Sequence, residues 1–231
     1  MDYAYPEQSS SLRLFHGLRA LALYVLLGAG GLWHLIGVFE TTMRLLAGPV
    51  MILLGVWMGL EYRARVTPVG RRGFFLWSAG VITGSFVLEW IGVTTGTVFG
   101  QYGYGGILQP ELFSVPVAIG FAWLTMLLAS YALAKAVLRS DRGWMFYFIP
   151  VMGSLLMVGF DLLLEPAAQH LGYWQWNGGS VPLRNYLVWF LASLCFLTVG
   201  HFLRLLPKRI VRFGIHAYIA QMVYFGLVLV G

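Results

Sequence analysis

Seven apolar segments, each close to the length needed to cross a lipid bilayer, dominate this sequence of 231 residues. A membrane-spanning helix needs about 20 mostly apolar residues. Since a span must satisfy its own backbone polar groups, helices are the expected structure. The expected spans are 20–39, 45–60, 74–92, 113–134, 144–164, 183–203 and 213–230. The sequence therefore predicts an all-α integral membrane protein with about seven transmembrane helices in a single polytopic domain, residues 1–231.

The composition agrees with a membrane location. Charged residues make up only 10% of the chain, whereas about 25% is usual in soluble domains. The single cysteine, Cys195, lies within an apolar span, and we expect it to be buried as a small apolar side chain. The N-terminal residues lack the basic, apolar and small-residue order of a cleaved signal peptide, so the first apolar run is expected to remain as an anchor.

The basic residues predict the orientation. With the N-terminus inside, two of them fall on the outer side, Arg44 and Arg184. Thirteen fall on the inner side: Arg13, Arg19, Arg63, Arg65, Arg71, Arg72, Lys135, Arg139, Arg142, Arg204, Lys208, Arg209 and Arg212. Cytoplasmic loops carry an excess of Lys and Arg, which predicts an N-terminus inside and a place in the cytoplasmic (inner) membrane. Topology thus explains the basic pI, and no nucleic-acid partner is expected.

The two halves of the chain share a pattern of an acid, an aromatic-rich connection, Val-Pro and Trp. Its members are Glu89, Tyr102, Tyr104, Val115, Pro116 and Trp123 in the first half, and Asp161, Glu165, Trp174, Trp176, Val181, Pro182 and Trp189 in the second. Each Pro precedes its Trp by seven residues, or two helical turns, and proline suits the start of a helix. Because both acid-bearing spans run in one direction, the pattern predicts a parallel internal repeat, and such repeats often enclose the functional site.

Two outer connections, 93–112 and 165–182, contain neither Lys nor Arg and are rich in glycine and aromatic residues. They are too apolar for ordinary solvent loops and too glycine-rich for helices. Non-helical backbone at membrane depth is tolerated when it is buried in protein or lines a cavity. We therefore expect these connections to dip into the membrane or to cap a cavity.

Three acids, Glu89, Asp161 and Glu165, lie inside or at the ends of spans, where an ionisable residue marks a functional site by default. Asp161 and Glu165 are four residues apart and share a helix face. Two carboxylates close together in a low dielectric cannot both ionise cheaply, so one of them is expected to hold a proton for general acid catalysis. The alternative is that Arg184 or a helix-capping N–H pairs with one of them. The remaining acids are expected to be solvated charges: Asp2, Glu7, Glu40, Glu61, Glu111 and Asp141.

The histidines do not predict a metal site or a cofactor. His34 and His170 belong to the outer half, whereas His201 and His216 lie toward the inner side. At a rise of about 1.5 Å per residue, most of the bilayer separates the two pairs. No HxxxH or HExxH spacing occurs, and no phosphate-binding glycine motif follows a strand.

The expected outer cavity thus holds carboxylates, aromatic rings, Asn185 and one of Thr94 or Thr95. Such a cavity suits proton-initiated chemistry on an apolar substrate. A carboxylic acid protonates an alkene to a tertiary cation, aromatic faces stabilise that cation, and water or an internal double bond captures it. The same aromatic residues are also typical of a membrane-interface belt.

The runs "EWIGVTTGTVFGQYGYG", "SVPVAIGFAW", "FDLLLEPAAQHLGYWQW" and "VPLRNYLVWF" resemble the carotenoid biosynthesis membrane-protein family, of the carotenoid 1,2-hydratase and bisanhydrobacterioruberin hydratase type, over about residues 74–204. The matching positions are Glu89, Gly92, Gly96, Phe99, Gly100, Tyr102, Tyr104, Asp161, Glu165, Pro166, Tyr173, Trp174, Trp176, Pro182, Asn185 and Trp189. The resemblance implies cofactor-free addition of water across the terminal C1–C2 double bond of an acyclic carotenoid end group.

Within that reading, Asp161 or Glu165 is expected to protonate C2, and Glu89 to orient or deprotonate the water that attacks C1. Asn185 is expected to position this water. The substrate-binding residues are expected to be Tyr102, Tyr104, Tyr173, Trp174, Trp176, Asn185, Trp123 and Trp189. The partners would be an apolar carotenoid, water and membrane lipid.

Two other functions remain open. A lycopene-type carotenoid cyclase begins with the same protonation but captures the cation internally. A proton-coupled transporter or a carotenoid-binding or retinal-binding protein would be non-enzymatic. A transporter should continue the polar path inward, where the sequence offers His201 and His216, and a retinal pigment needs a mid-span lysine. Both lysines, Lys135 and Lys208, lie at the inner boundary, which argues against a Schiff base.

Overall fold

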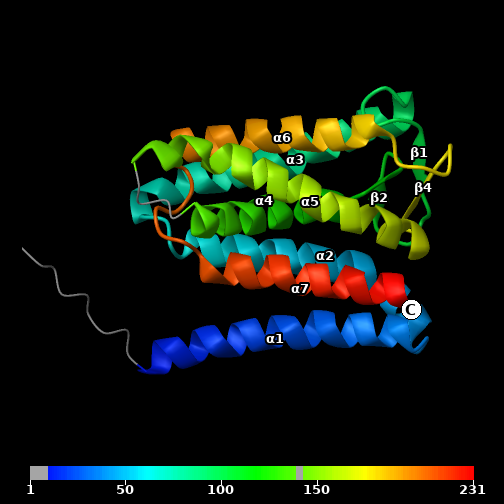
Figure 1. The fold of residues 1–231 in the computed structure, drawn as a ribbon, viewed down its shortest axis with the longest axis horizontal. Helices are drawn as coiled ribbons and strands as arrows, with labels where there is room; N and C mark the ends of the chain where they lie inside the picture. Colours follow the sequence, from blue (N-terminus) through cyan, green and yellow to red (C-terminus); the bar gives the residue numbers. More distant parts are fainter. Residues whose placement is uncertain (1–9, 139–142) are drawn as a thin grey trace, which may run out of the picture.

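The computed structural model is a bundle of α-helices with short strands at one end (Figure 1). It describes residues 10–138 and 143–231, with side chains from residue 17 onward. The helices are α1 (Ser10–Leu35), α2 (Glu40–Arg63), α3 (Arg71–Thr95), α4 (Ala118–Val137), α5 (Ile149–His170), α6 (Leu183–Phe202) and α7 (Arg212–Val230), with short 3₁₀ helices η1 (Pro68–Gly70) and η2 (Gly143–Phe148). Within the described ranges, seven helices are long and apolar enough to cross a membrane. The predicted multi-pass helical fold is confirmed.

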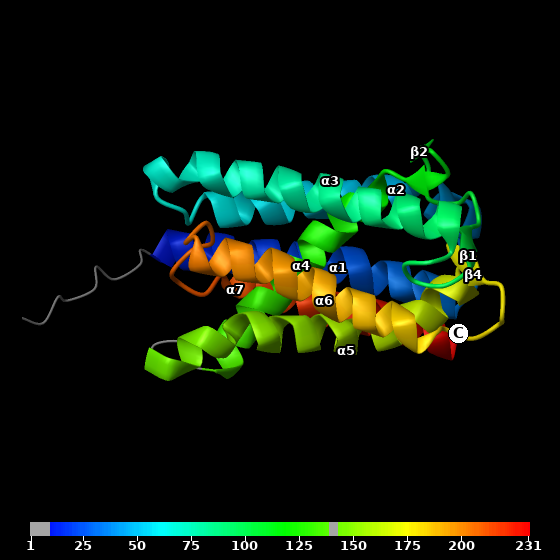
Figure 2. The same ribbon diagram turned by 90° about the horizontal axis from the view of Figure 1, so that it is seen from above.

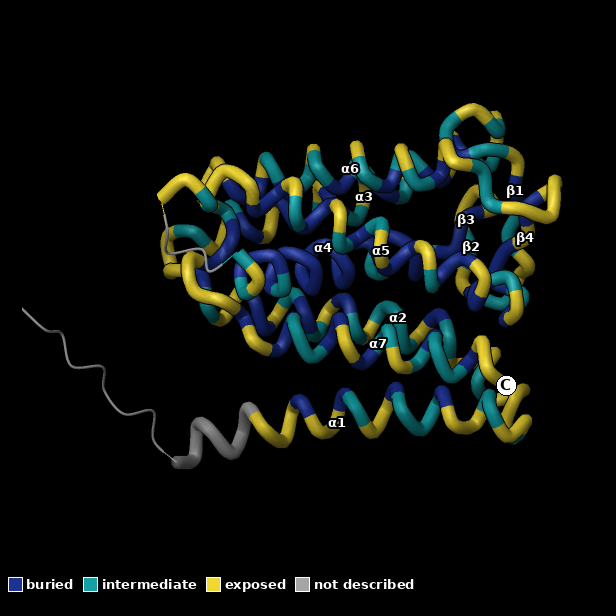
Figure 3. The backbone as a smooth tube through the Cα atoms, viewed as in Figure 1, coloured by how far each residue is buried: buried dark blue, intermediate teal, exposed yellow. Residues whose placement is uncertain are grey.

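Helix α4 lies at the centre of the bundle and is buried along most of its length (Figure 3). It packs against α2, α3, α5 and α7, whereas α1 packs mainly against α7 (Figure 2). Small residues permit this close packing, as is usual between membrane helices. A Cβ atom at Gly120 of α4 would lie 2.6 Å from the backbone oxygen of Ile82 on α3. The central position of α4 therefore depends on residues that leave room for neighbouring backbones.

The two glycine-rich and aromatic connections meet as paired strands. Strand β1 (Tyr102–Tyr104) pairs with β4 (Trp174–Trp176) in an antiparallel register that places Gly103 opposite Gln175. Strands β2 (Glu111–Leu112) and β3 (Val115–Pro116) form a separate small hairpin. Side chains two residues apart point to the same face of a strand, so the four aromatic residues of β1 and β4 share one face. The two connections that were expected to cap a cavity thus form a paired, two-stranded structure.

This strand pair relates the two halves of the chain by a local two-fold symmetry. The amide of Gly105 donates to the carbonyl oxygen of Tyr173 at 2.9 Å, and the amide of Asn177 donates to that of Gln101 at 3.0 Å. Helices α3 and α5 both run toward this end of the bundle, and α4 and α6 both run away from it (Figures 1 and 2). The halves thus have the parallel arrangement that the repeated pattern predicts.

Several helix boundaries differ from the expected ones. The fourth helix begins at Ala118 rather than at residue 113, because the preceding residues form the β2–β3 hairpin. Pro116 therefore lies two residues before the helix, and Pro182 is the N-cap of α6. Helix α5 continues to His170, so Glu165 lies on a helix rather than in a connection.

Two expectations about individual residues are wrong. Cys195 is exposed on the outer face of α6 instead of buried. Glu61, expected as a solvated charge, is buried. Its carboxylate binds Arg19 at 2.7 Å and Arg65 at 2.6 Å, because the start of α1 and the end of α2 bring these arginines together.

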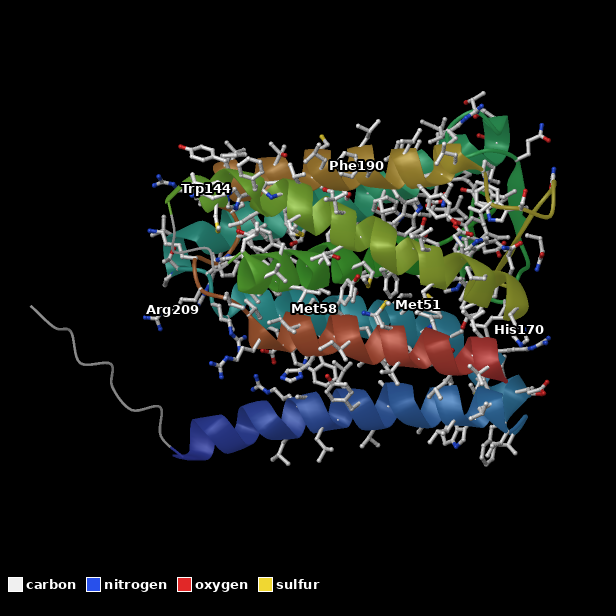
Figure 4. The ribbon with its side chains drawn as sticks, viewed as in Figure 1. Met51, Met58, Trp144, His170, Phe190 and Arg209 are labelled. Atoms are coloured by element: carbon white, nitrogen blue, oxygen red, sulfur yellow. The ribbon has the colours of Figure 1, made fainter. Side chains whose placement is uncertain are left out.

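The two ends of the bundle differ in charge, as the inner–outer asymmetry predicts. We call the end with β1 and β4 the strand end and the opposite one the basic end. Arg209 and Trp144 lie at the basic end, and His170 at the strand end (Figure 4). Arg139, Asp141, Arg142, Asp2 and Glu7 lie outside the described residues, as does the side chain of Arg13. That the basic end faces the cytoplasm stays a prediction.

Candidate active site

Glu89, on the last two turns of α3, is the first of three buried acids at the strand end. Its Oε2 accepts hydrogen bonds from the hydroxyl groups of Tyr102 at 2.5 Å and Tyr104 at 2.9 Å. Its Oε1 accepts one from the indole Nε1 of Trp123, on α4, at 3.2 Å. All three partners are neutral. Hydrogen bonding is what makes a buried carboxyl group tolerable, and here the strand β1 supplies two of the three donors.

Glu165, on α5, has an equivalent set of partners. Its Oε2 accepts from the indole Nε1 atoms of Trp174 at 2.9 Å and Trp176 at 2.8 Å, both on β4. Its Oε1 accepts from the amide Nδ2 of Asn185, on α6, at 3.1 Å. The strand pair β1–β4 thus positions donors for both acids, one from each half of the chain.

Asp161 lies one turn before Glu165 and is fully buried. The same Nδ2 atom of Asn185 donates to its Oδ2 at 2.8 Å, so one amide group bridges two carboxyl groups. The Oδ1 atom of Asp161 is buried and has no hydrogen-bond partner among the described residues. Two acidic groups that share a single N–H donor group repel each other when both are ionised. This pair is therefore suited to share one proton.

The two glutamates line one cavity of about 190 Å³ at the strand end. Aromatic residues contribute most of the surrounding wall near the acids, and mainly aliphatic residues of α1, α2 and α4 contribute much of the rest. All eight residues expected to bind substrate line it: Tyr102, Tyr104, Trp123, Tyr173, Trp174, Trp176, Asn185 and Trp189. Asp161 does not line the cavity and lies behind Glu165 and Asn185.

Burial sets the protonation of the two cavity tyrosines. The pKa of Tyr102 and that of Tyr104 are raised above the usual value of a phenol, first by burial and second by the nearby Glu89. Loss of the phenolic proton is thus disfavoured, and both hydroxyl groups stay neutral hydrogen-bond donors at physiological pH. They can stabilise a negative charge on Glu89 by hydrogen bonding while they keep their own protons.

The structure excludes some expected members of the site. Thr94 and Thr95 are exposed and donate their hydroxyl hydrogens to backbone oxygens of their own helix. Arg184, which was the alternative partner for an acid, instead donates to the backbone oxygen of Thr97 at 3.0 Å. Trp189 stacks on Trp123 with ring centroids 4.3 Å apart. It thus helps to hold the indole that donates a hydrogen bond to Glu89.

The cavity also includes residues that the sequence pattern did not indicate. They lie outside the repeated pattern and are mostly apolar, and they include Met51 on α2, Met126 on α4, Phe160 on α5, and Gln221, Tyr224 and Phe225 on α7. Apolar residues in a span carry no signal that separates a cavity wall from a lipid-facing surface. Among them, only the polar group of Gln221 and the hydroxyl group of Tyr224 hint at an interior role.

Fold and site together define a multi-pass membrane protein with a buried cavity of acids and aromatic side chains. Residues 47–230 match the model of the carotenoid biosynthesis protein family, and the chain belongs to that family. It is also 28% identical over 153 residues to the bisanhydrobacterioruberin hydratase of Haloarcula japonica, an alignment that covers 63% of this chain. The chain spans about half the length of this curated relative, 51%. No solved structure matches the chain.

Proposed function

We propose that the protein is a carotenoid hydratase that adds water across the terminal C1–C2 double bond of an acyclic carotenoid end group. The observation that carries the proposal is the pair of glutamates, Glu89 and Glu165, held by neutral donors in one apolar, aromatic cavity. The hydratase relative supports the same reaction class. This chemistry needs an acid, a base and water, all of which the cavity can bring together.

Glu165 is the proton donor in this proposal, because it reaches the cavity and Asp161 does not. The Asn185 amide donates to both Asp161 and Glu165, and repulsion between the two carboxylates favours a state in which one of them is protonated. In this proposal Glu165 carries that proton and delivers it to C2. The C1 position then carries the positive charge of a tertiary cation. Surrounding aromatic faces stabilise it by cation–π attraction.

Glu89 is the base. Its two tyrosine donors and its tryptophan donor stabilise the carboxylate form. It accepts a proton from the water molecule as the oxygen bonds to C1, so the product is a tertiary alcohol. A proton then returns from Glu89 to the Asp161–Glu165 pair, through water, and restores the starting state. Overall, one water molecule is consumed for each double bond.

An apolar end group can reach the cavity from the bilayer. Among the described lining residues, those that are exposed all lie on α1 or α2: Leu26, Trp33, Thr42 and Leu46. These two helices barely contact each other, since α1 packs on α7 and α2 on α4. In a membrane, such exposed apolar positions face lipid. The opening between α1 and α2 is therefore the expected entrance for the polyene.

The non-enzymatic alternatives have less support. Lys135 donates hydrogen bonds to the backbone oxygens of Pro207 and Lys208 at the basic end, far from the cavity, so it is not placed to form a retinal Schiff base. His201, which a transporter could use to continue the polar path inward, lies near the basic end, and its Nδ1 is hydrogen-bonded to the hydroxyl group of Tyr131. A cyclase would use the same acid, and it is separated from a hydratase by the product.

The test is to co-express the chain with lycopene or γ-carotene biosynthesis in a bacterium that makes no carotenoids, and to analyse the pigments by mass spectrometry. A product heavier by one water is expected. A product of unchanged mass with a shortened chromophore would identify a cyclase instead. Absence of any new pigment, with the protein present in the membrane, would refute the proposal.

The Glu165→Gln variant should lower the yield of hydrated pigment by about 100-fold or more, as expected for the loss of a general acid. Glu111→Gln is the matched control. Glu111 is a glutamate at the same end of the bundle, but it lies on β2 and does not line the cavity. Full activity of Glu165→Gln would exclude this residue as the proton donor.

A further inference from the structure

A second pocket, of about 330 Å³, lies beside the acid cavity at the strand end and is polar where the cavity is apolar. Exposed Glu40, Arg44 and His170 lie around its mouth, and buried Leu171 and Tyr173 lie at its floor. His170 projects at this end of the bundle (Figure 4). The pocket thus leads from a charged surface into the protein, and it is large enough for several water molecules.

The two pockets share part of their lining. Met43 and Tyr173 line both of them, so these side chains form the partition between the polar pocket and the acid cavity. The phenol of Tyr173 interacts electrostatically with that of Tyr224, which lines the cavity. The ring of Tyr224 lies 5.9 Å from the imidazole of His34, which lines the polar pocket. Side chains with polar groups from both pockets are therefore neighbours at the partition.

We propose that the polar pocket is the port through which water enters the acid cavity, with Tyr173 and Met43 as its inner gate. This inference rests on the proposed hydration, which consumes one water molecule per turnover. The opening between α1 and α2 exposes mainly apolar side chains, which do not bind water. The two reactants of opposite polarity thus enter through different openings, the polyene from the lipid and water from the polar pocket.

Separate entry has a chemical consequence. A tertiary cation loses a proton readily, so excess water in the cavity would favour side reactions, and sites of this kind restrict it. Two side chains between the polar pocket and the cavity limit the supply to the water molecules that pass them. The hydroxyl groups of Tyr173 and Tyr224 offer hydrogen bonds along this path.

The test uses cysteine accessibility in membrane vesicles, in a Cys195→Ser background that contains no other cysteine. A cationic, membrane-impermeant thiosulfonate reagent is added from the side of the strand end. Met43→Cys, at the partition, should react about tenfold faster or more than Met51→Cys, since the reactive thiolate forms only where water reaches it. Met51 is the matched control, because it lies two turns further along α2 and lines only the acid cavity. Equal reaction rates, or no reaction at Met43→Cys, would overturn the proposal.

The gate is tested by shortening it. Tyr173→Ala should make Met51→Cys reactive, whereas Tyr173→Phe, which keeps the ring, should leave it protected. Met43→Ala shortens the partition from the other side and should also expose Met51→Cys, so the test does not depend on one variant. Continued protection of Met51→Cys in both alanine variants would show that these side chains are not the gate.

Blocking the port should stop the chemistry. Modification of Met43→Cys by the bulky reagent should lower the yield of hydrated pigment by about tenfold or more, because the reactant water is excluded while the path from the lipid stays open. Full hydration by the modified protein would overturn the role in water supply. The labelling rates do not depend on activity, so a failure of the hydratase assignment and a failure of the port are read separately.

Discussion

The two halves of the repeat build the same acid site with different donors. In the first acid unit, Glu89 accepts hydrogen bonds from two tyrosine hydroxyl groups and one indole. In the second acid unit, Glu165 accepts from two indoles and one amide. A hydroxyl group can donate and accept, whereas an indole N–H only donates. The tyrosine hydroxyl groups of the first acid unit can therefore relay protons to and from Glu89, whereas the indoles of the second acid unit cannot relay protons to Glu165.

The second acid unit has an additional carboxyl group in place of those hydroxyls. Asp161 shares the Asn185 amide with Glu165 and is shielded from the cavity. In the proposed mechanism this pair stores the proton that the indoles cannot supply. The comparison shows how one backbone arrangement, used twice, can provide a base on one side of a cavity and an acid on the other.

The largest expected effect distinguishes these roles. In deuterated water, Glu165→Gln should neither hydrate the substrate nor incorporate deuterium at C2, because no proton reaches the double bond. Glu89→Gln should also lose hydration, by about 100-fold or more, yet still exchange deuterium at C2, because protonation by Glu165 and its reversal continue. Mass spectrometry of recovered substrate measures both. Exchange in Glu165→Gln but not in Glu89→Gln would reverse the two assignments.

The next largest effect should come from the strand pair that both acid units share. A Cβ atom at Gly105 would collide with the backbone oxygen of Gly172, so Gly105→Ala must separate β1 from β4. We expect hydration to fall sharply and the free energy of unfolding to drop by about 1–3 kcal/mol. Gly103→Ala, two residues earlier and within β1, has no heavy atom within 4 Å of the added methyl group and is the control. Equal behaviour of both variants in activity and thermal-denaturation assays would contradict the role of the strand pair.

Removing one donor from each acid unit should have a smaller effect. Tyr102→Phe and Trp176→Phe each delete one hydrogen bond to a glutamate. A hydrogen bond to a charged group contributes about 1.5–3 kcal/mol and one between neutral groups about 0.5–1.5 kcal/mol. Tyr102→Phe should therefore lose roughly tenfold or more of the hydration rate, and Trp176→Phe, whose partner Glu165 carries the proton, should lose less. If proton transfer through tyrosine matters, Tyr102→Phe should also show a changed solvent isotope effect, and Trp176→Phe should not. An unchanged isotope effect in both variants would limit tyrosine to charge stabilisation.

The smallest effect concerns the contact between the repeats. Trp189→Phe removes much of the stacking on Trp123, which itself donates to Glu89. An aromatic pair contributes about 0.5–1.5 kcal/mol beyond its buried area, and the free energy of unfolding in detergent should fall by that order. A variant as stable as the parent would show that Trp123 is held by other contacts.

The repeated pattern aligned the acids only partly. Glu89 and Asp161 are 72 residues apart, as are Tyr102 and Trp174, so the spacing pairs Glu89 with Asp161. The hydrogen bonds instead make Glu165 the equivalent of Glu89. A shift of one helical turn keeps the same helix face, so the pattern cannot tell these two positions apart.

The sequence by itself determined the seven spans, the place of three acids near one end of the bundle, and the carotenoid family that the motifs resemble. Hydropathy suffices for the spans because the bilayer demands a fixed length of apolar helix. It does not determine how each helix is rotated, since lipid and protein interior are equally apolar. For that reason only the tertiary structure showed that Cys195 faces outward and that Glu61 is buried.

Tertiary structure also decided which acids meet. The pairing of β1 with β4 joins connections about 70 residues apart and gives each glutamate its donors. It placed Glu165 in the cavity and Asp161 behind it. These contacts come from hydrogen bonds between distant segments, whereas the spans come from a local match between helix length and bilayer thickness.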